Sequence, residues 1–352
     1  MTLLSETVAA IEPLSAQAVA DAEGRHRQLT KPPGALGALE SLGNRLAGIY
    51  DQCPPPLPEP VAVVVFAADH GVHAQGVSPW PQEVTAQMVA NFLSGGAAIN
   101  AIARQCGAQV SVVDVGVASE LGAADGLLDR KVRPGSGDMT QGPAMTEREV
   151  RAALAVGIEV AHALVAAGNR LLVAGDMGIA NTTASAALVS VFTGAGVESV
   201  TGRGAGIDDA MLEHKVCVVR RALDLHRPDR EDPLAALAAV GGLEHAAIVG
   251  FLLGACALRT PVVLDGVIAC SAALVAEAIA PGAVGYWIAG HRSSEPGATA
   301  ALAQLGLEPL IDLGLRLGEG SGAALAVPLV QAAARVLVEM ATFDQAGVTG
   351  KG

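Results

Sequence analysis

The stretch RLLVAGDMGIANTTASAAL, Arg170–Leu188, decides the fold class of this chain of 352 residues. It begins with a short apolar run, turns at glycines, and continues with small residues that are typical of a helix. An apolar run of this length without polar alternation indicates a strand that is buried on both faces. Such a strand followed by a helix is the repeating unit of an α/β protein with a parallel sheet.

Other apolar runs of the same kind occur along the chain, separated by longer helical patterns. In the clearest helical pattern, Thr146 and Glu149 form a capping box and Gly168 supplies the C-terminal stop. The sequence therefore predicts an α/β fold whose mostly parallel sheet is covered by helices on both sides. The further predicted strands are Val61–Ala67, Gln109–Val115, Pro261–Asp265 and Val284–Ala289.

Both ends of the chain lack strand patterns. We expect helices over Leu4–Gly24 and Ala35–Tyr50, followed by the proline-rich segment Cys53–Pro60, and the chain after Ala323 is again purely helical through about Ala341. We therefore predict a small helical domain from residues 1–55 together with about 325–352. Residues 56–324 would form the large α/β domain that carries the active site.

Composition narrows the class of protein. Half of the residues are hydrophobic and 16% are charged, which excludes disorder. The formal net charge of −13 argues against nucleic acid or an anionic membrane as the main partner. The apolar run Ala246–Leu258 is shorter than the ~20 residues of a membrane span, so we expect a buried helix there. The N-terminus lacks the basic segment of a signal peptide, and the five scattered cysteines suit reduced thiols, so we expect a cytoplasmic protein.

The loop after the first predicted strand is polar, and ligands of open α/β sheets bind outside the carboxyl ends of the strands. Asp69, His70 and His73 are types of residue that ligate metals, but no further ligand follows them at a suggestive spacing. We therefore expect no metal. A loop lining a substrate pocket is favoured, with Ser78 and Gln87 as hydrogen-bonding groups, although simple loop scaffolding remains open for each side chain.

The glycine turn within GDMGIANTT offers backbone N–H groups and hydroxyls to an anion at the start of a helix. A tight turn with an Asn or Thr cap is the structural alternative. Asp176 suits a ribose hydroxyl or a positively charged ring, since a carboxylate repels phosphate. No P-loop, G-x-S-x-G motif or paired catalytic Cys and His accompanies this turn.

Two further glycine-containing segments complete the candidate site. In TGRGAG, the glycines allow a ligand to approach the backbone closely, and Arg203 and Lys215 are the candidate cations for a phosphate. A solvent-exposed helix face is the alternative for Lys215. In GHRSSEPG, Ser293 is placed for an anion or a ribose, or for a simple capping loop.

Taken together and in order, these segments resemble one family, the nicotinate-nucleotide–dimethylbenzimidazole phosphoribosyltransferases of cobalamin biosynthesis. The resemblance extends from about Lys31 to Met340, nearly the whole chain. The motifs that carry it are KPPGALG (31–37), AADHGV (67–72), GDMGIANTT (175–183), TGRGAG (201–206), GGLEHAA (241–247), GHRSSEPG (290–297) and LRLGEGSGA (315–323).

The resemblance implies an activity and an architecture. The family transfers the ribose 5-phosphate of nicotinate mononucleotide to 5,6-dimethylbenzimidazole, giving α-ribazole 5′-phosphate and nicotinate with inversion at the anomeric carbon. It implies a Rossmann-like large domain, a small helical domain from both chain ends and a homodimer. It implies neither a metal nor an organic cofactor.

The resemblance also implies site residues. The family's catalytic base is the glutamate of LRLGEGSGA, here Glu319, and the glycines around it leave room for a planar acceptor. The family usually has Glu where this chain has Asp176, so the carboxylate is one methylene shorter. The acceptor pocket is assigned to Ser78, Gln87 and Leu317. Nucleotide and phosphate are assigned to Gly175, Asp176, Met177, Gly178, Ile179, Ala180, Asn181, Thr182, Gly202, Arg203, Gly204, Lys215, Ser293 and Arg316.

Two other classes of protein use the same kinds of loop. A non-catalytic nucleotide-binding module explains the glycines but gives no role to Glu319. A different glycosyltransferase or a nucleosidase would use another acceptor, or water. Which benzimidazole or purine is the physiological acceptor does not follow from the residues.

Overall fold

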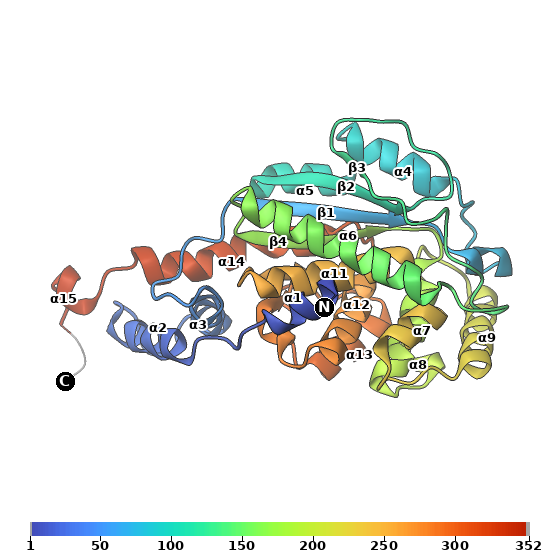
Figure 1. Cartoon of the computed structure of the whole chain (residues 1–352). Coiled ribbons are helices and arrows are strands. Elements are labelled where there is room, and N and C mark those ends of the chain that lie inside the picture. The colour runs from blue at the N-terminus through green and yellow to red at the C-terminus, as the bar shows by residue number, and fades with distance from the viewer. Residues whose placement is uncertain (1, 350–352) are drawn as a thin grey trace.

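The computed structural model describes residues 2–349 and forms a single parallel sheet between two layers of helices (Figure 1). The strands are β1 (Val61–Ala68), β2 (Ala108–Gly116), β3 (Leu127–Asp129), β4 (Leu171–Met177), β5 (Val262–Leu264) and β6 (Trp287–Ala289). The helices are α1 (Leu3–Ala9), α2 (Ala16–Gln28), α3 (Ala38–Tyr50), α4 (Val84–Leu93), α5 (Ala98–Cys106), α6 (Glu147–Ala166), α7 (Asn181–Thr193), α8 (Val197–Val200), α9 (Asp209–His226), α10 (Pro233–Val240), α11 (Leu243–Ala257), α12 (Val267–Ile279), α13 (Pro296–Leu305), α14 (Ser321–Glu339) and α15 (Phe343–Ala346), with 3₁₀ turns η1 (Gly71–Gln75) and η2 (Ala283–Tyr286).

The strand order is β3-β2-β1-β4-β5-β6, and every neighbouring pair is parallel. This is the order of the dinucleotide-binding Rossmann fold, in which the ligand crevice lies where the order reverses. The reversal falls between β1 and β4. The predicted parallel sheet is confirmed, although β3 was not predicted. β6 is shorter than predicted because η2 occupies the first part of that run.

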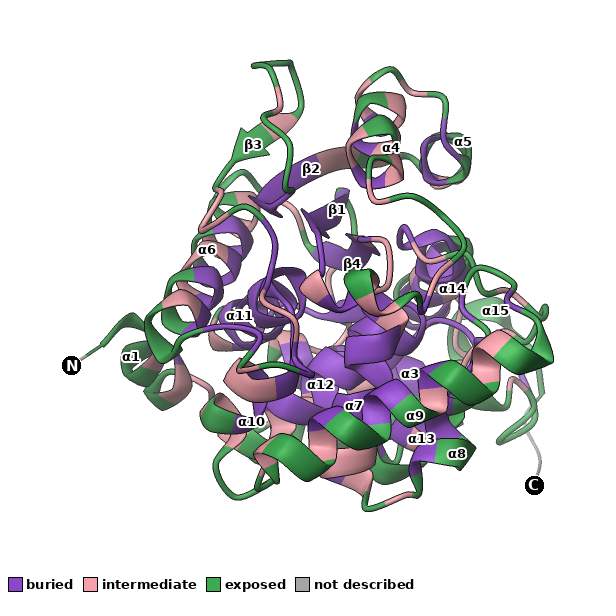
Figure 2. Ribbon diagram, turned by 90° about the vertical axis from the view of Figure 1, so that its right-hand side faces the viewer, coloured by how far each residue is buried: buried purple, intermediate pink, exposed green. Residues whose placement is uncertain are grey.

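Alternate residues of β1 pack against the two helical layers. Val61, Val63 and Val65 face a cluster built from α3, α4, α5 and α14. Val64 and Phe66 face the larger cluster that includes α6, α7, α11 and α12. Burial on both faces explains why the strands are continuous apolar runs. Figure 2 shows α7, α11 and α12 as mostly buried helices.

Helices α6 and α11 pack closely because glycines lie at their contact. A Cβ at Gly157 would lie 1.8 Å from the carbonyl oxygen of Ala247, and one at Gly250 would lie 2.0 Å from that of Leu154. The expected buried helix around Ala246–Leu258 is confirmed, since nearly every residue of α11 is buried. The capping box that begins α6 is also present.

Helices from the N-terminal and C-terminal parts of the chain meet at one side of the molecule. Helices α2 and α3 pack on each other and on α14, and the amide of Thr30 donates to the carbonyl oxygen of Ala341 at 3.1 Å (Figure 1). The predicted single helix Leu4–Gly24 is wrong. The chain leaves α1 before Pro13, which lacks a backbone N–H, and Ser15 caps the new helix α2.

The two helices of this N-terminal segment have different neighbours. α1 contacts α6 and α11, whereas α2 contacts α3 and α14. Residues 1 and 350–352 of the predicted small domain lie outside the described part of the chain.

Helix α14 is, among residues 2–349, the one helix that is long and apolar enough to cross a membrane by length and composition. It packs against α3, α5, β4 and β5, and its inward residues belong to the core beside the sheet. These contacts are those of a core helix. Its first turn lies at the carboxyl edge of the sheet, where the site is found.

Candidate active site

A cavity opens at the carboxyl edge of the sheet, around the point where the strand order reverses. Its walls come from the loops after β1, β4, β5 and β6, from the segment before α9, and from the segment before α14. The structure therefore brings together glycine-containing segments that are far apart in the sequence. The predicted site residues on its wall are Ser78, Asp176, Met177, Gly178, Ile179, Ala180, Asn181, Thr182, Arg203, Gly204, Lys215, Ser293, Arg316 and Leu317.

Four predicted residues do not line this cavity. Gly175 lies behind Glu319, since a Cβ there would come within 2.5 Å of the Glu319 carbonyl oxygen. Gly202 packs against the carboxylate of Glu295. Glu319 lies beside the wall residue Gly318, and Gln87 is exposed on α4.

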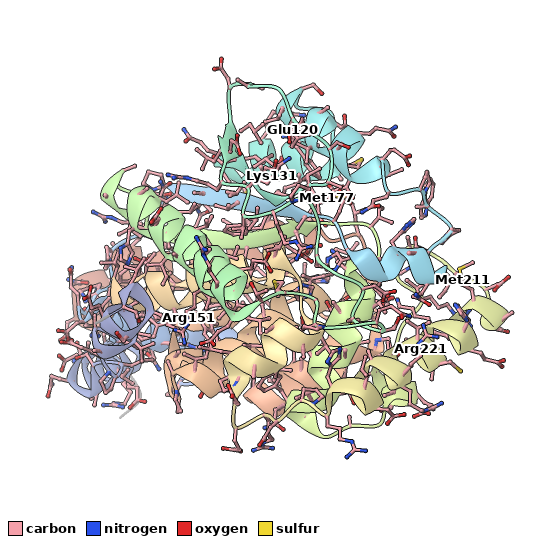
Figure 3. The ribbon with its side chains drawn as sticks, turned by 45° about the vertical axis from the view of Figure 1, so that its right-hand side comes forward. Glu120, Lys131, Arg151, Met177, Met211 and Arg221 are labelled. Carbon is pink, nitrogen blue, oxygen red and sulfur yellow. The ribbon has the colours of Figure 1, made fainter. Side chains whose placement is uncertain are left out.

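Lys215 forms the cationic side of the cavity. It projects inward from α9, the helix marked by Met211 and Arg221 in Figure 3, and is 1% exposed. Its Nζ donates to Thr182 Oγ1 at 2.7 Å and to the carbonyl oxygen of Gly202 at 3.2 Å. Burial lowers the pKa of Lys215 to about 8, although the nearby carboxylate of Glu295 opposes the shift. The alternative of a solvent-exposed helix face is excluded.

The start of α7 faces the same cavity. Its N-cap is Ala180, which has a left-handed φ of 76°, and no side chain caps the helix. The predicted alternative of an Asn or Thr cap is therefore absent at this turn. The backbone N–H of Ile179 is already used, because it donates to Thr85 Oγ1 at 3.1 Å.

Two arginines and one carboxylate organise the loops around Lys215. Arg316 Nη1 donates to the carbonyl oxygen of Gly204 at 2.8 Å, and Glu295 Oε1 accepts from the amide of Gly204 at 2.7 Å. Arg203 is exposed, and it pairs with Asp209. The buried Glu295 thus ties the TGRGAG segment to the GHRSSEPG segment.

Glu319 forms the acidic side of the site and is 5% exposed. Its φ is 65°, and its neighbours Gly318 and Gly320 have φ values of 83° and 84°. A non-glycine residue in the left-handed region is strained, and such strain clusters at functional sites. Glu319 Oε2 accepts a hydrogen bond of 3.3 Å from the amide of Ile99, in the first turn of α5.

The pKa of Glu319 is raised. Burial is the main cause, the amide of Ile99 opposes it, and the negative charge of Asp265 adds to it. A carboxylate with a raised pKa is a stronger base, which suits it to take a proton from a weak acid.

Asp176, at the end of β4, accepts from Asn181 Nδ2 at 3.0 Å through one oxygen, and its other oxygen has no hydrogen-bond partner among residues 2–349. Burial raises the pKa of Asp176 well above its ordinary value. The negative charges of Asp265, Glu244 and Glu319 add to this, and the hydrogen bond from Asn181 opposes it.

Sequence reasoning missed Asp265 and His291. Asp265 Oδ1 accepts from the amide of Ala323 at 2.9 Å, and His291 Nε2 lies 3.4 Å from the same oxygen. Asp265 directly follows β5, and His291 follows β6 after a single glycine. The rule that ligands bind at the carboxyl ends of strands was therefore the signal that could have found them.

The two histidines of the H-x-x-H pattern have different neighbours in the structure. His73 Nε2 bonds to the carbonyl oxygen of Trp80, whereas His70 is buried and meets Glu244 and His245. Ligand-type atoms of these last three lie within 4.8 Å of one another. However, His70 Nε2 is hydrogen-bonded to Glu244 Oε1, and His245 Nδ1 lies at ion-pair distance from the same oxygen, so the arrangement fits a buried polar cluster better than a metal site.

The fold and the site define an α/β nucleotide-binding enzyme with the buried cation Lys215 on its cavity wall and the buried carboxylate Glu319 next to the wall residue Gly318. The family model described as "Phosphoribosyltransferase" matches residues 11–348. The chain belongs to the nicotinate-nucleotide–dimethylbenzimidazole phosphoribosyltransferase family, as the relatives with that name show.

Several of these relatives are similar over their full length. The protein of that name from Salinispora tropica is 59% identical, over 99% of this chain and 100% of its own length. The one from Chloroflexus aggregans is 54% identical, over 100% and 99%. The crystal structure of the enzyme from Thermus thermophilus has a TM-score of 0.91 and 50% identity, covering 96% of this chain and 100% of its own. This chain is therefore a transferase of the same family.

Proposed function

We propose that the chain transfers the ribose 5-phosphate of nicotinate mononucleotide to 5,6-dimethylbenzimidazole, giving α-ribazole 5′-phosphate and nicotinate for the lower ligand of cobalamin. One observation carries this proposal. The buried cation Lys215 lines the cavity at the point where a Rossmann-type sheet binds its ligand, and the buried carboxylate Glu319 directly follows the wall residue Gly318.

The phosphate of the mononucleotide lies at the start of α7 in this proposal. No side chain caps that helix end, and a helix N-terminus attracts an anion. Lys215 adds a full charge beside Thr182, and Arg316 and Ser293 lie on the same wall. The nucleotide is therefore oriented with its phosphate at Lys215 and its ribose towards Asp176.

Glu319 acts as the general base on the acceptor. Dimethylbenzimidazole carries one N–H and one nitrogen with a free lone pair. As that lone pair forms the bond to C1′, Glu319 takes the N–H proton, and the bond from C1′ to nicotinate breaks. Nicotinate leaves with its bonding electrons as a neutral ring nitrogen. Base assistance of this kind typically contributes about 10²–10⁴-fold to the rate.

Asp176 stabilises the positive charge that develops on the sugar as nicotinate leaves. Its raised pKa favours a neutral carboxyl before the substrate binds. The positively charged pyridinium of the nucleotide opposes that effect, because a nearby cation favours the ionised carboxylate. The shorter side chain of Asp176, compared with the glutamate usual in the family, makes this contact sensitive to its position.

The acceptor lies against Ser78 and Leu317 on the cavity wall. We further propose that the enzyme is a cytoplasmic homodimer, and that residues 1–55 with about 325–352 act as a small helical domain beside the α/β domain 56–324. The packing of α2 and α3 on α14 supports that division, whereas α1 packs on α6 and α11 of the α/β domain.

The experiment is to incubate the protein with nicotinate mononucleotide, with and without dimethylbenzimidazole, and to measure nicotinate and α-ribazole 5′-phosphate. Release of nicotinate only with the acceptor is the expected result. Release without the acceptor would indicate a nucleosidase, and no release in either case would indicate a binding module.

A further inference from the structure

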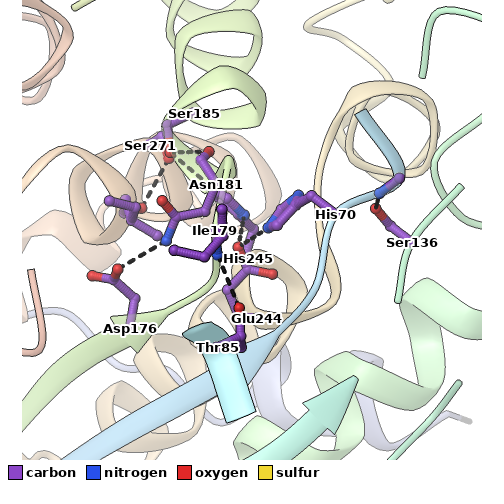
Figure 4. A network of polar contacts seen from close by, with 12 residues as sticks. His70, Thr85, Ser136, Asp176, Ile179, Asn181, Ser185, Glu244, His245 and Ser271 are labelled. Atoms are coloured by element: carbon purple, nitrogen blue, oxygen red, sulfur yellow. Dashed lines mark hydrogen bonds and ion pairs between the residues drawn. The ribbon is translucent and has the colours of Figure 1, made fainter. Parts of the chain in front are cut away.

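Three ionisable side chains lie fully buried beneath the GDMGIANTT turn. His70 comes from the loop after β1, and Glu244 and His245 come from the first turn of α11; none is more than 1% exposed. Glu244 Oε1 lies 2.6 Å from His70 Nε2 and 2.9 Å from His245 Nδ1 (Figure 4). Burying such groups costs free energy that apolar residues would not cost, so the cluster calls for a functional explanation.

A chain of polar contacts leads from this cluster to the active site. His245 Nε2 lies 2.8 Å from Ser185 Oγ, and Ser185 Oγ lies 3.2 Å from the carbonyl oxygen of Asn181. The side chain of Asn181 then donates to Asp176 at 3.0 Å (Figure 4). Each link in this chain is buried, so water does not screen or replace it.

The cluster carries charge. Burial alone would raise the pKa of Glu244, but His70 and His245 lower it below its ordinary value. Burial alone would lower the pKa of His70, but Glu244 raises it. An ionised Glu244 therefore lies behind the substrate cavity, against the ring of His70, whose pKa it raises.

Asp176 receives two opposite influences from this network. The charge of Glu244 raises its pKa, and the hydrogen bond from Asn181 lowers it. The other titratable groups facing Asp176 are Asp265 after β5, with His291 beside it, and Glu319 before α14. Among these effects on the pKa of Asp176, only those of Glu244 and Asn181 depend on the buried cluster and the contacts that lead from it.

We propose that His70, Glu244 and His245 are positioning residues that set the orientation and charge of Asp176 through Ser185 and Asn181. The cluster does not touch the substrate, and it acts by holding the first turn of α7 and by the field of Glu244. This inference rests on the proposed role of Asp176 in stabilising the sugar cation.

The test is the pH profile of kcat for Ser185→Ala and Glu244→Gln. Turnover is lost on the acid side as Asp176 or the base Glu319 takes up a proton, and only the contribution of Asp176 is absent from an Asp176→Asn background. Ser185→Ala loosens Asn181 and weakens its hydrogen bond, so the acid limb moves to higher pH and kcat at neutral pH falls about 10-fold. Glu244→Gln removes a negative charge, so the acid limb moves to lower pH.

Ser190→Ala is the matched control, because it removes a hydroxyl from the same helix. Its Oγ donates to the carbonyl oxygen of Ala195 at 2.8 Å, away from the site. We expect its acid limb to stay at the parent position. An Asp176→Asn background should abolish the shift caused by Ser185→Ala, since the two changes act on one group.

Shifts of the same sign in Ser185→Ala and Glu244→Gln, or no shift, would overturn the proposal, as would a shift that persists in the Asp176→Asn background. Parent turnover in Asp176→Asn alone would overturn the role of Asp176, which is a distinct failure. If Glu244→Gln does not fold, the Ser185→Ala profile decides alone. One equivalent of a transition metal in the purified protein, lost in His70→Ala, would also overturn the hydrogen-bonded cluster.

Discussion

Two helices begin at the carboxyl edge of the sheet after similar glycine-rich segments, and their N-termini differ. α7 follows GDMGIAN, and no side chain caps it. α14 follows LRLGEGS, and the carboxylate of Asp265 accepts from its Ala323 amide. Glu319, from the second segment, in turn accepts from the first turn of α5. Carboxylates of the protein therefore bind the N-termini of α14 and α5, whereas the N-terminus of α7 is left for a ligand.

This difference separates the anion site from the base. A helix end that binds a carboxylate of the protein has its positive potential neutralised, so it does not attract a phosphate. An uncapped end beside Lys215 does. Similar local sequences thus give one helix end that attracts an anion and one that does not. The difference is whether a distant loop supplies a carboxylate to the helix N-terminus. The following predictions test that contrast.

Glu319→Gln should have the largest effect. The amide cannot take the proton of the acceptor, so kcat should fall about 10²–10⁴-fold while binding of nicotinate mononucleotide is retained. Steady-state kinetics with a separate binding measurement check this. Parent turnover would remove Glu319 from the role of base and would leave it as a cap of α5.

Lys215→Ala should affect the anion site rather than the base. Losing a charged hydrogen-bond donor to phosphate should raise KM for the mononucleotide about 10–100-fold, with far less effect on KM for dimethylbenzimidazole. Initial rates with each substrate varied in turn provide the measurement. Equal changes in both KM values would place the phosphate elsewhere.

The pH dependence of kcat/KM should also distinguish the anion site from the base. Because burial lowers the pKa of Lys215 to about 8, its charge is lost as the pH rises through that value. The kcat/KM for the mononucleotide, which reports the free enzyme, should then fall roughly tenfold per pH unit above it. Lys215→Arg, which stays protonated, should flatten this alkaline limb. A limb unchanged in Lys215→Arg would assign it to another group.

Ala180→Gly should have the smallest effect. Ala180 has a φ of 76° at the start of α7, and glycine adopts this conformation without strain. After the greater entropy of glycine in the unfolded chain is subtracted, we expect a gain of about 0.5–1 kcal/mol in the free energy of unfolding. Chemical denaturation measures it. A loss of stability would mean that the left-handed turn is not strained.

Much of the fold could be predicted from the sequence because it depends on local patterns. Buried strands appeared as apolar runs, and the box of Thr146 and Glu149 marked the start of α6. The break before α2 was missed because the helical pattern continues through Pro13. β3 was missed because its three residues, two leucines and an aspartate at the edge of the sheet, form a run too short to indicate a strand.

The candidate site was predicted only where glycine-rich segments marked it. Asp265 and His291 were overlooked although they follow strands, and Glu244 and His245 stood within a recognised motif without an assigned task. An acidic residue and a histidine inside an otherwise apolar helix were the available signal. Their partners, His70 and Ser185, are far away in the sequence, so no spacing could connect them.

The sequence by itself determined the α/β class, the family and the set of loops that form the site, because these follow from periodicity and from short motifs. Only the tertiary structure decided which helix end remains open, that Lys215 is buried, and that Glu319 is paired with α5. The physical reason is that burial and electrostatic potential depend on groups brought together from distant parts of the chain. The glycines of LRLGEGSGA permit the unusual backbone at Glu319, but the surrounding elements give that carboxylate its basicity.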